Sequence, residues 1–530
     1  MSLLSVENLS LSIRGTSILR DVSLQLDAGE VVAITGESGS GKSMTALAVI
    51  QLLPEGSEVD GQIVLDGDDV TAMNEAALCR LRGDVVSMVF QEPMTALNPV
   101  QTIGAQVAET VRLHRPDLDP VKRASEVLTR VGLAPDLIPM SRYPHELSGG
   151  QRQRVVIAIA IACGPKLLIA DEPTTALDVT TQAQILDLLV QLAGEDGMGL
   201  MMITHDLAVV AQMAQRIIVM QNGEVVEAGN TSTLLANPQH PYTRALFAAS
   251  NHQVTLPEIA QTTPLLRVKN VVRDYVLPRT RLFQRPATHR AVDHVSFDIA
   301  RGERVGLVGE SGCGKSTLTR AILGLEAVQS GSITLDGAPV FSGGTPDLSV
   351  RRRMQVVFQD PYGSFNPRHR VARLITEPFH LLETRPDNTD ERIAVALTAV
   401  GLSPDDAEKY PHQFSGGQRQ RLAIARALII RPDLIVFDEA VSALDVSVRA
   451  QILDLIAELC VQYDLTYLFI SHDLSVVRTI TDRVLVMQAG QIVEQGATEA
   501  VFTAPTHPYT RTLIDAAPIL PVSPKTKVMP

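Results

Sequence analysis

The sequence has no tryptophan, few cysteines and no long apolar run. None of its apolar stretches reaches the roughly 18 to 20 residues that a helix needs to span a bilayer, and the N-terminus lacks the basic and apolar regions of a secretory signal. The four cysteines form no CxxC pair, which argues against a zinc site and fits a reducing compartment. Acidic residues outnumber basic ones by 59 to 46, so a broad nucleic-acid-binding surface is not expected.

Several motifs occur twice, in the same order, in the two halves of the chain. They are LLSVENL and LLRVKNV at 3–9 and 265–271, GESGSGKS and GESGCGKS at 36–43 and 309–316, SGGQRQR at 148–154 and 415–421, and HPYTR at 240–244 and 507–511. So many matches in one order indicate a duplication. We therefore expect one domain over residues 1–250 and a second over 265–530, with a polar, proline-containing linker over 251–264.

Each half alternates short apolar runs with amphipathic segments. The runs VVAIT at 31–35, LLIAD at 167–171 and LMMIT at 200–204 have counterparts in the second half. Continuous apolar runs of this length are typical of strands that are buried on both faces of a parallel sheet, with helices between them. The predicted fold class is α/β, formed twice.

Two glycine-rich motifs of the form GxxxxGK[ST] follow a buried strand, one in each half. Their glycines allow backbone N–H groups to converge on phosphate oxygens, and the helix that follows directs its positive dipole end at them. We expect Lys42 and Lys315 to reach the β- and γ-phosphates, and Ser43 and Ser316 to ligate Mg²⁺. The nucleotide-binding residues predicted in these loops are Gly36, Ser38, Gly39, Gly41, Lys42 and Ser43, and Gly309, Ser311, Gly312, Gly314, Lys315 and Ser316.

An Asp-Glu pair ends a buried strand in each half. Asp171 and Asp438 suit a Mg²⁺-binding role, and Glu172 and Glu439 would orient or polarise the attacking water. A lone acidic pair of this kind is more often just a solvated strand end. Its occurrence after a phosphate loop in both halves favours the catalytic interpretation.

A glutamine and a histidine follow two further strands of each half. Gln91 and Gln359 are predicted to sense the γ-phosphate through Mg²⁺ or water, which makes them both nucleotide and metal contacts. His205 and His472 are predicted to bind the γ-phosphate or to hold the attacking water. A lone histidine at a strand end is more often structural, but the paired occurrence in one motif order reverses that weighting.

The sequence SGGQ opens an apolar helix in each half. Serine is available as the helix cap, and the two glycines permit a close backbone approach, so each motif is a second anion-binding device. The alternative is a well-capped helix without a ligand, but P-loop ATPases in general do not carry this motif. The residues concerned are Ser148, Gly150 and Gln151, and Ser415, Gly417 and Gln418.

Together these motifs resemble the ATP-binding cassette (ABC) ATPases over essentially the whole chain, in the order Walker A, Q-loop, signature, Walker B, D-loop and H-loop. The resemblance implies that each half has a RecA-like core, an antiparallel β subdomain and an α-helical subdomain. It also implies that the two halves pair head-to-tail within the chain. ATP would then lie between Lys42 and Ser415 at one site, and between Lys315 and Ser148 at the other.

The segments that carry HPYTR, at 237–249 and 504–517, are similar to the C-terminal extension of the oligopeptide/dipeptide/nickel importer ATPases. The fused layout is most similar to the double-ATPase subunits of peptide and microcin C importers, with those of glutathione importers as the competing identification. The resemblance implies two transmembrane permease subunits as partners and, indirectly, an extracytoplasmic solute-binding protein. It places the chain peripherally at the cytoplasmic face of the plasma membrane and implies uptake of peptides or peptide-like solutes.

The chain departs from the family pattern at the position of the adenine-stacking aromatic residue. Tyr275 fits this role in the second half, whereas Ile13 aligns with it in the first, so the first site is expected to hold ATP less tightly. Some relatives also bind an iron–sulfur cluster after the HPY motif. No cysteine follows His240 in the first tail or His507 in the second, so no cluster is expected.

A soluble tandem cassette that acts on ribosomes or nucleic acid is the alternative function. Such proteins typically insert a long, charged helical linker between their cassettes. The linker at 251–264 is short and nearly uncharged, and the chain is acidic overall. We therefore expect a transport ATPase with no nucleic-acid partner.

Overall fold

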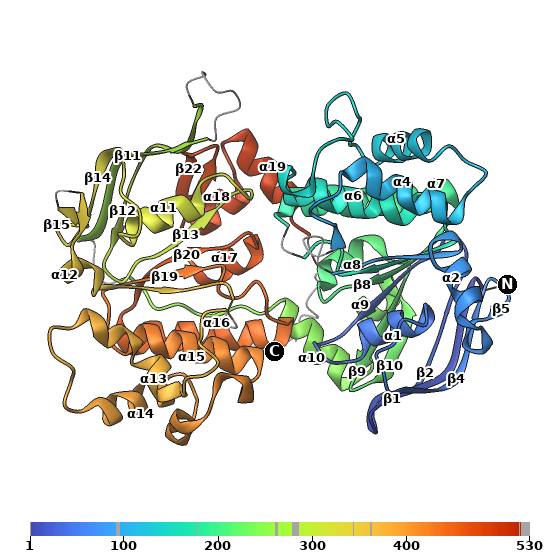
Figure 1. Cartoon of the computed structure of the whole chain (residues 1–530). Coiled ribbons are helices and arrows are strands. Elements are labelled where there is room, and N and C mark those ends of the chain that lie inside the picture. Colours follow the sequence, from blue (N-terminus) through green and yellow to red (C-terminus); the bar gives the residue numbers. More distant parts are fainter. Residues whose placement is uncertain are drawn as a thin grey trace, which may run out of the picture.

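The computed structural model describes residues 2–91, 96–175, 177–259, 263–277, 286–342, 344–360, 363–518 and 520. The predicted linker and the predicted second domain therefore each extend into residues outside these ranges. Figure 1 shows the two halves side by side, with the first half in blue to green and the second in yellow to red. No helix within the described ranges is long and apolar enough to cross a membrane.

The first half contains an antiparallel sheet and a larger, mostly parallel sheet. The antiparallel sheet has the order β2-β1-β4-β5, and the larger one β10-β9-β3-β8-β7-β6, in which only β10 is antiparallel to its neighbour. The strands are β1 (Leu4–Ile13), β2 (Thr16–Leu26), β3 (Val31–Thr35), β4 (Ser57–Leu65), β5 (Asp68–Asp69), β6 (Val86–Val89), β7 (Leu167–Asp171), β8 (Gly199–Ile203), β9 (Arg216–Gln221) and β10 (Glu224–Asn230).

Helices cover both faces of the larger sheet and form a separate helical layer. They are α1 (Lys42–Val49), α2 (Glu75–Asp84), α4 (Ile103–His114), α5 (Pro120–Arg130), α6 (Gly149–Ile161), α7 (Val179–Asp196), α8 (Leu207–Met213), α9 (Thr231–Ala236) and α10 (Pro241–Ser250). The helices α4, α5 and α6 pack on one another and correspond to the expected α-helical subdomain.

The second half repeats this architecture, with the sheet orders β12-β11-β14-β15 and β18-β19-β20-β13-β21-β22. Its strands are β11 (Pro264–Val276), β12 (Thr288–Ala300), β13 (Arg304–Val308), β14 (Ser330–Leu335), β15 (Ala338–Pro339), β16 (Phe341–Ser342), β17 (Thr345–Pro346), β18 (Met354–Val357), β19 (Leu434–Asp438), β20 (Thr466–Ile470), β21 (Arg483–Gln488) and β22 (Gln491–Ala497). Its helices are α11 (Lys315–Ile322), α12 (Leu348–Arg351), α13 (Val371–Ile375), α14 (Thr389–Ala399), α15 (Gly416–Leu428), α16 (Val446–Tyr463), α17 (Leu474–Ile480), α18 (Thr498–Thr503) and α19 (Pro508–Ala516).

The continuous apolar runs are strands that are buried on both faces, as the sequence predicts. In β7, Leu168 and Ala170 contribute to the core beneath the helical layer, whereas Leu167 and Ile169 contribute to the core shared with the antiparallel sheet. Successive side chains of a strand point to opposite faces, so a strand between two cores needs an apolar residue at every position. The α/β prediction is confirmed in both halves.

The two halves exchange their C-terminal helices. The helix α10 of the first half packs on α16 of the second, and α19 of the second half packs on α7 of the first (Figure 1). Beyond α10, Val254 and Leu256 contact the core of the second half, and Leu520 contacts the core of the first. The halves are therefore joined by packed apolar surface as well as by the linker.

Candidate active sites

Each phosphate loop adopts a backbone conformation that requires glycine. Gly36 has a φ of 150° and Gly41 a φ of 102°, and a Cβ atom on Gly36 would lie 2.2 Å from the carbonyl oxygen of Met220. In the second loop, Gly309 and Gly314 have φ angles of 153° and 111°, and their Cβ atoms would lie 2.2 and 2.1 Å from backbone oxygens. Both loops lead into a helix whose first residue is the predicted phosphate-binding lysine.

Both lysines bond to their own loops. Lys42 Nζ donates to the carbonyl oxygens of Gly36 and Glu37 at 2.8 and 2.7 Å, and Lys315 Nζ donates to those of Gly309 and Glu310 at 2.7 and 2.8 Å. Burial lowers the pKa of Lys42, and the negative charges of Glu172 and Asp445, which would raise it, offset only part of this effect. An anionic phosphate oxygen is a stronger acceptor than a carbonyl oxygen, so each ammonium group can turn from its loop to a triphosphate.

Asp171 has the chemistry of a Mg²⁺-binding residue. Its side chain is buried, and its Oδ1 has no hydrogen-bond partner within the described part of the chain. Burial raises the pKa of Asp171, whereas a hydrogen bond with the Ser43 side chain lowers it. In the second half, burial and the charge of Glu439 raise the pKa of Asp438.

A bound cation would satisfy the orphaned oxygen and charge of Asp171. No cluster of three or more His, Cys, Asp or Glu side chains with metal-binding geometry exists in the described ranges. Mg²⁺ commonly takes one or two protein oxygens together with substrate phosphates and water. The pair of Ser43 and Asp171 therefore fits Mg²⁺ that arrives with a nucleotide.

Glu172 is held by three polar side chains. Its carboxylate lies 3.1 Å from His205 Nδ1 and accepts hydrogen bonds from Gln91 Nε2 at 2.7 Å and from Thr175 Oγ1 at 3.0 Å. Burial alone would raise the pKa of Glu172, but the hydrogen bond and charge of His205, together with Thr175 and Lys42, lower it to about 2. Glu172 is therefore ionised at neutral pH and can accept a hydrogen bond from a water molecule.

Glu439 occupies the same position in the second half with looser contacts. Its carboxylate lies 3.5 Å from His472 Nδ1, and Gln359 Nε2 donates to Ser442 Oγ at 3.4 Å instead of to the carboxylate. Burial would raise the pKa of Glu439, but His472 lowers it. Both glutamates have positive φ angles, 46° and 51°, which non-glycine residues rarely adopt outside functional or strained positions.

Both signature motifs form helix caps. Ser148 Oγ accepts from Gln151 N at 3.3 Å while Gln151 Oε1 accepts from Ser148 N at 3.0 Å, and Ser415 and Gln418 repeat this geometry. The second glycine of each motif lies against a long helix of its own half. A Cβ atom on Gly150 would lie 2.3 Å from Thr181 Cγ2 of α7, and the second half shows the same close approach between α15 and α16.

Each phosphate loop contacts the other half of the chain. Ser38 N donates to Asp445 Oδ1 at 3.0 Å, and the Ser447 hydroxyl bonds to Glu37. The second loop shows the same pattern, because Thr180 Oγ1 donates to Glu310 Oε1 at 2.8 Å and the backbone of Ser311 hydrogen-bonds to Asp178. Asp178 and Asp445 are the last residues of the D-loops and stand directly before α7 and α16.

These contacts bring each phosphate loop to the helix on which the opposite signature motif packs. The first loop meets the start of α16, where Gly417 lies close to Val448, and the second loop meets the start of α7. Ser148 and Ser415 themselves are exposed. Each phosphate loop thus contacts the D-loop of the opposite half, and that D-loop leads into the helix on which the signature motif of the opposite half packs.

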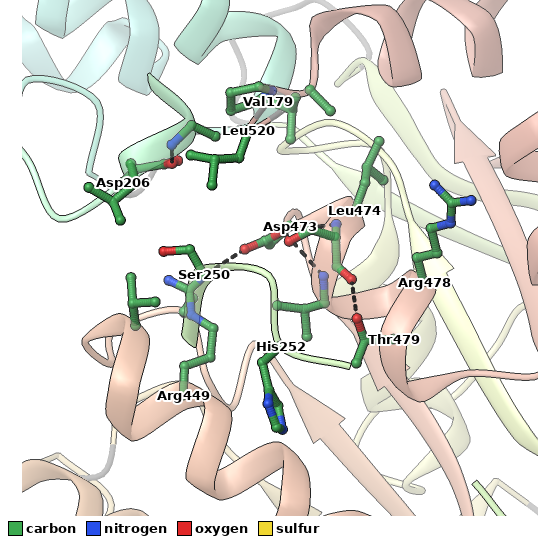
Figure 2. Close-up of a pocket in the computed structure, with 18 of the residues that line it drawn as sticks. Val179, Asp206, Ser250, His252, Arg449, Asp473, Leu474, Arg478, Thr479 and Leu520 are labelled. Atoms are coloured by element: carbon green, nitrogen blue, oxygen red, sulfur yellow. Dashed lines mark hydrogen bonds and ion pairs between the residues drawn. The ribbon is translucent and has the colours of Figure 1, made fainter. Parts of the chain in front are cut away.

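A cavity of about 730 Å³ lies between the halves and is lined by residues of both, including His205 and His472. Asp206 lies on its wall in the first half, and Asp473 with Arg449 on its wall in the second (Figure 2). Arg449 Nη1 bonds to Asp473 Oδ2 at 2.6 Å. Burial raises the pKa of Asp206, and the negative charge of Asp473 across the cavity adds to this effect.

The predicted adenine contact differs between the halves. Tyr275 is partly buried, its hydroxyl donates to Glu326 Oε2 at 2.5 Å, and the guanidinium of Arg273 lies 4.9 Å from the ring centroid. Ile13 ends β1 at the corresponding place in the first half. The aromatic side chain is therefore fixed at one site and has no aromatic counterpart at the other.

Sequence reasoning did not single out three residues that the structure places at the interface. Thr180 and Ser447 contact the opposite phosphate loop, and Arg449 lines the shared cavity. Thr180 and Ser447 each lie two residues after the end of a D-loop, so the repeat was a signal that could have identified them. The first half has Gln182 at the position that aligns with Arg449. This difference between the repeats was a signal that could have drawn attention to Arg449 as a residue of the cavity.

Comparison with known proteins identifies the family of the chain. The family described as "ABC transporter" matches residues 19–175 and 292–442, and the "Oligopeptide/dipeptide transporter, C-terminal region" matches 226–267 and 493–528. The glutathione import ATP-binding protein GsiA of Escherichia coli K12 is 45% identical over 98% of this chain and 90% of its own length. GsiA of Pectobacterium atrosepticum is 45% identical over 95% of this chain and 87% of its own length.

A solved dimeric ATP-binding cassette with bound ADP and phosphate matches 43% of this chain and 98% of its own, at 32% identity and a TM-score of 0.39. The two family matches cover the Walker A, Q-loop, signature and Walker B motifs of both halves. The chain therefore belongs to the ABC transporter family, as an ATPase with two ATP-binding cassettes that each carry the C-terminal region of the oligopeptide/dipeptide transporters.

Proposed function

We propose that the chain is the ATP-hydrolysing subunit of an importer that takes up peptides or peptide-like solutes, with glutathione as one candidate. Two observations support this. The relatives that it matches over nearly their whole length are named as glutathione import ATP-binding proteins. Both tails also match the C-terminal region of oligopeptide and dipeptide transporters.

The contact of each phosphate loop with the opposite D-loop carries the mechanistic part of the proposal. At the first site, Lys42 and the loop amides would bind the triphosphate from one side, and the Ser415 helix start from the other. Ser148 and Lys315 would do the same at the second site. Because both halves contact each nucleotide, ATP binding favours the closed pair and hydrolysis releases it.

Glu172 and Glu439 would each accept a hydrogen bond from the attacking water, with His205 and His472 holding the carboxylates in place. Mg²⁺, bound by Ser43 and Asp171 and by Ser316 and Asp438, would neutralise charge on the phosphates. Gln91 and Gln359 would report the presence of the γ-phosphate. In the structure Gln91 donates to Glu172, so the glutamine can exchange this partner for one of the ligands.

Closure of the halves would be transmitted to two separate transmembrane permease subunits, and solute would reach them from an extracytoplasmic binding protein. In this assembly the chain lies peripherally on the cytoplasmic face of the membrane. The linker gives no support to a ribosomal role. Its described part is docked on the second half, where Arg304 Nη2 donates to Pro257 O at 2.5 Å.

The test is a double variant, Glu172→Gln with Glu439→Gln, reconstituted with the permease subunits and binding protein in proteoliposomes. ATP hydrolysis and uptake of labelled glutathione and a labelled tripeptide should both fall by about 10²-fold or more, since removal of a positioned general base has effects of this size. ATP should remain bound, because the phosphate loops are intact. The control is Glu458→Gln, an exposed residue of α16. Hydrolysis at the wild-type rate in the double variant would contradict the assignment.

A further inference from the structure

The tails reach back to the phosphate loops of their own halves. Tyr242 Oη accepts a hydrogen bond from Glu37 N at 2.9 Å, and Tyr509 Oη accepts one from Glu310 N at 2.9 Å. These two tyrosines belong to the repeated HPYTR motif. The same contact occurs in both halves, which indicates that it is a regular feature of this fold.

The rest of the motif fixes where the tyrosine points. His240 Nδ1 accepts from Tyr242 N at 3.3 Å and so caps α10, and Pro241 occupies the first turn, where its missing N–H costs nothing. The backbone N–H of His240 donates to Glu227 of β10 at 3.0 Å, which ties the helix start to the sheet. The second tail repeats all of these features from His507 onward.

Burial keeps both hydroxyl groups neutral. It raises the pKa of Tyr242 to about 12 and raises that of Tyr509 further. A neutral hydroxyl has lone pairs for the backbone N–H and keeps one proton of its own. The contact therefore persists across the pH range in which the protein works.

The residues held by the tyrosine also contact the other half. Glu37 bonds to Ser447, and the next residue, Ser38, donates its N–H to Asp445. The helix α10 that carries Tyr242 packs on α16, which begins directly after Asp445. The first tail thus contacts two partners that also contact each other. Its Tyr242 bonds to the first phosphate loop, and its helix α10 packs on α16, which begins where that loop meets the opposite D-loop.

We propose that Tyr242 and Tyr509 are positioning residues for the two phosphate loops. Each hydroxyl orients the peptide N–H at the start of the loop away from the phosphate-binding amides that follow. The loop is then preorganised for the triphosphate, and its ordering does not have to be supplied by the ligand. This inference rests on the proposed ATP-binding function and assigns a task to the tail that goes beyond it.

The test is a Tyr242→Phe substitution in the full chain, which removes the hydroxyl group and keeps the ring. A Lys315→Ala background restricts tight ATP binding to the first loop. Loss of one neutral hydrogen bond should weaken ATP binding about two- to tenfold. The rate at saturating ATP and the melting temperature should not change, so KM rises while kcat stays constant. Tyr509→Phe in a Lys42→Ala background should give the same result at the second loop.

The control is Tyr463→Phe, at the end of α16 and away from both loops. Equal ATP affinity of Tyr242→Phe and its parent overturns the proposal. A melting temperature that falls in proportion to the affinity also overturns it, since the tyrosine would then only hold the fold together. If the parent chain itself fails to bind ATP, the proposed function fails instead, and the two failures are distinguished.

Discussion

At the residue scale, the two glutamates proposed as catalytic, Glu172 and Glu439, differ in how they are held. Glu172 is in contact with His205, Gln91 and Thr175, whereas the contact of Glu439 with His472 is longer. The hydrogen bond and charge of His205, together with Thr175 and Lys42, lower the pKa of Glu172 to about 2. The carboxylate of the first half is therefore the more firmly oriented one. Only the second half has an aromatic residue, Tyr275, at the predicted adenine contact.

The pair of Glu172 and His205 should make stability depend on pH. Because the pKa of Glu172 is lowered from 4.5, its contribution is present above that value and is lost as pH falls toward about 2. Because the pKa of His205 is raised from 6.5, its contribution is full below that value and is lost as pH rises through the raised pKa. The pair is thus most stabilising between pH 4.5 and 6.5.

Substitution of His205→Gln keeps a donor but removes the charge. The free energy of unfolding, measured with urea, should fall by about 1 kcal/mol near pH 5.5, because a charge-assisted hydrogen bond is roughly twice as strong as the neutral one that replaces it. The difference from wild type should shrink as pH rises above 6.5 and through the raised pKa of His205, where the histidine loses its charge. His472→Gln is the matched control, and its smaller effect follows from the longer contact. A pH-independent difference would show that the histidine acts by packing alone.

An aromatic residue at the first base site should tighten ATP binding. Ile13→Tyr, measured in the Lys315→Ala background, should lower the Kd for ATP about fivefold or more, since stacking on a base is worth about 1–3 kcal/mol in other settings. Tyr275→Ile with Lys42→Ala should weaken the second site in the opposite sense. Unchanged affinities in both variants would remove these positions from the base site.

The local conformation of the motifs was predictable from sequence, because it depends on residues that are close together in the chain. The glycines of the phosphate loops and the SGGQ caps are examples. Contacts such as Gln91 with Glu172 or Tyr242 with Glu37 join positions 81 and 205 residues apart, and no local pattern specifies them. The HPYTR repeat contains Tyr242 but indicates neither its role nor its partner.

At the element scale, the close packing of α6 on α7 links the signature motif to the D-loop. Gly150→Ala would place a methyl group 2.3 Å from Thr181, whereas the same group on Gly149 meets its nearest neighbour at 3.5 Å. Gly150→Ala should destabilise the protein by about 1–3 kcal/mol, the usual cost of overpacking, and should also lower ATPase activity. Gly149→Ala is the matched control and should stay within about 0.5 kcal/mol of wild type. Equal melting temperatures for the two variants would contradict this packing.

Buried strands were predictable as elements because short apolar runs of about five residues, bounded by turn signals, are typical of strands between two cores. The hairpin of β9 and β10 was likewise predictable, because Asn-Gly is a strong signal for a tight turn, and Asn222 and Gly223 both adopt the positive φ angles that such a turn needs. The packing of α10 on α16 was not predictable. It depends on the fit of two surfaces that the sequence does not place side by side.

At the scale of the whole molecule, the exchanged tails should keep the halves together without nucleotide. A protease site inserted between residues 259 and 263 would allow the folded chain to be cut in the linker. The two fragments should still migrate as one species on gel filtration in ATP-free buffer, because α10 lies on α16, α19 lies on α7, and His252 Nε2 lies 2.7 Å from Asp454 Oδ1. Uncut chain is the control. Separation of the fragments would show that the linker alone joins the halves.

The central claim is that each nucleotide is shared between the halves, and paired substitutions test it directly. Lys42→Ala with Ser415→Arg alters two sides of one shared site, so this chain should still bind one ATP with wild-type affinity in equilibrium dialysis. Lys42→Ala with Ser148→Arg alters both sites, and this chain should lose tight binding altogether. The reverse outcome, with one ATP retained by the second pair and none by the first, would show that each nucleotide lies within a single half and would contradict the account.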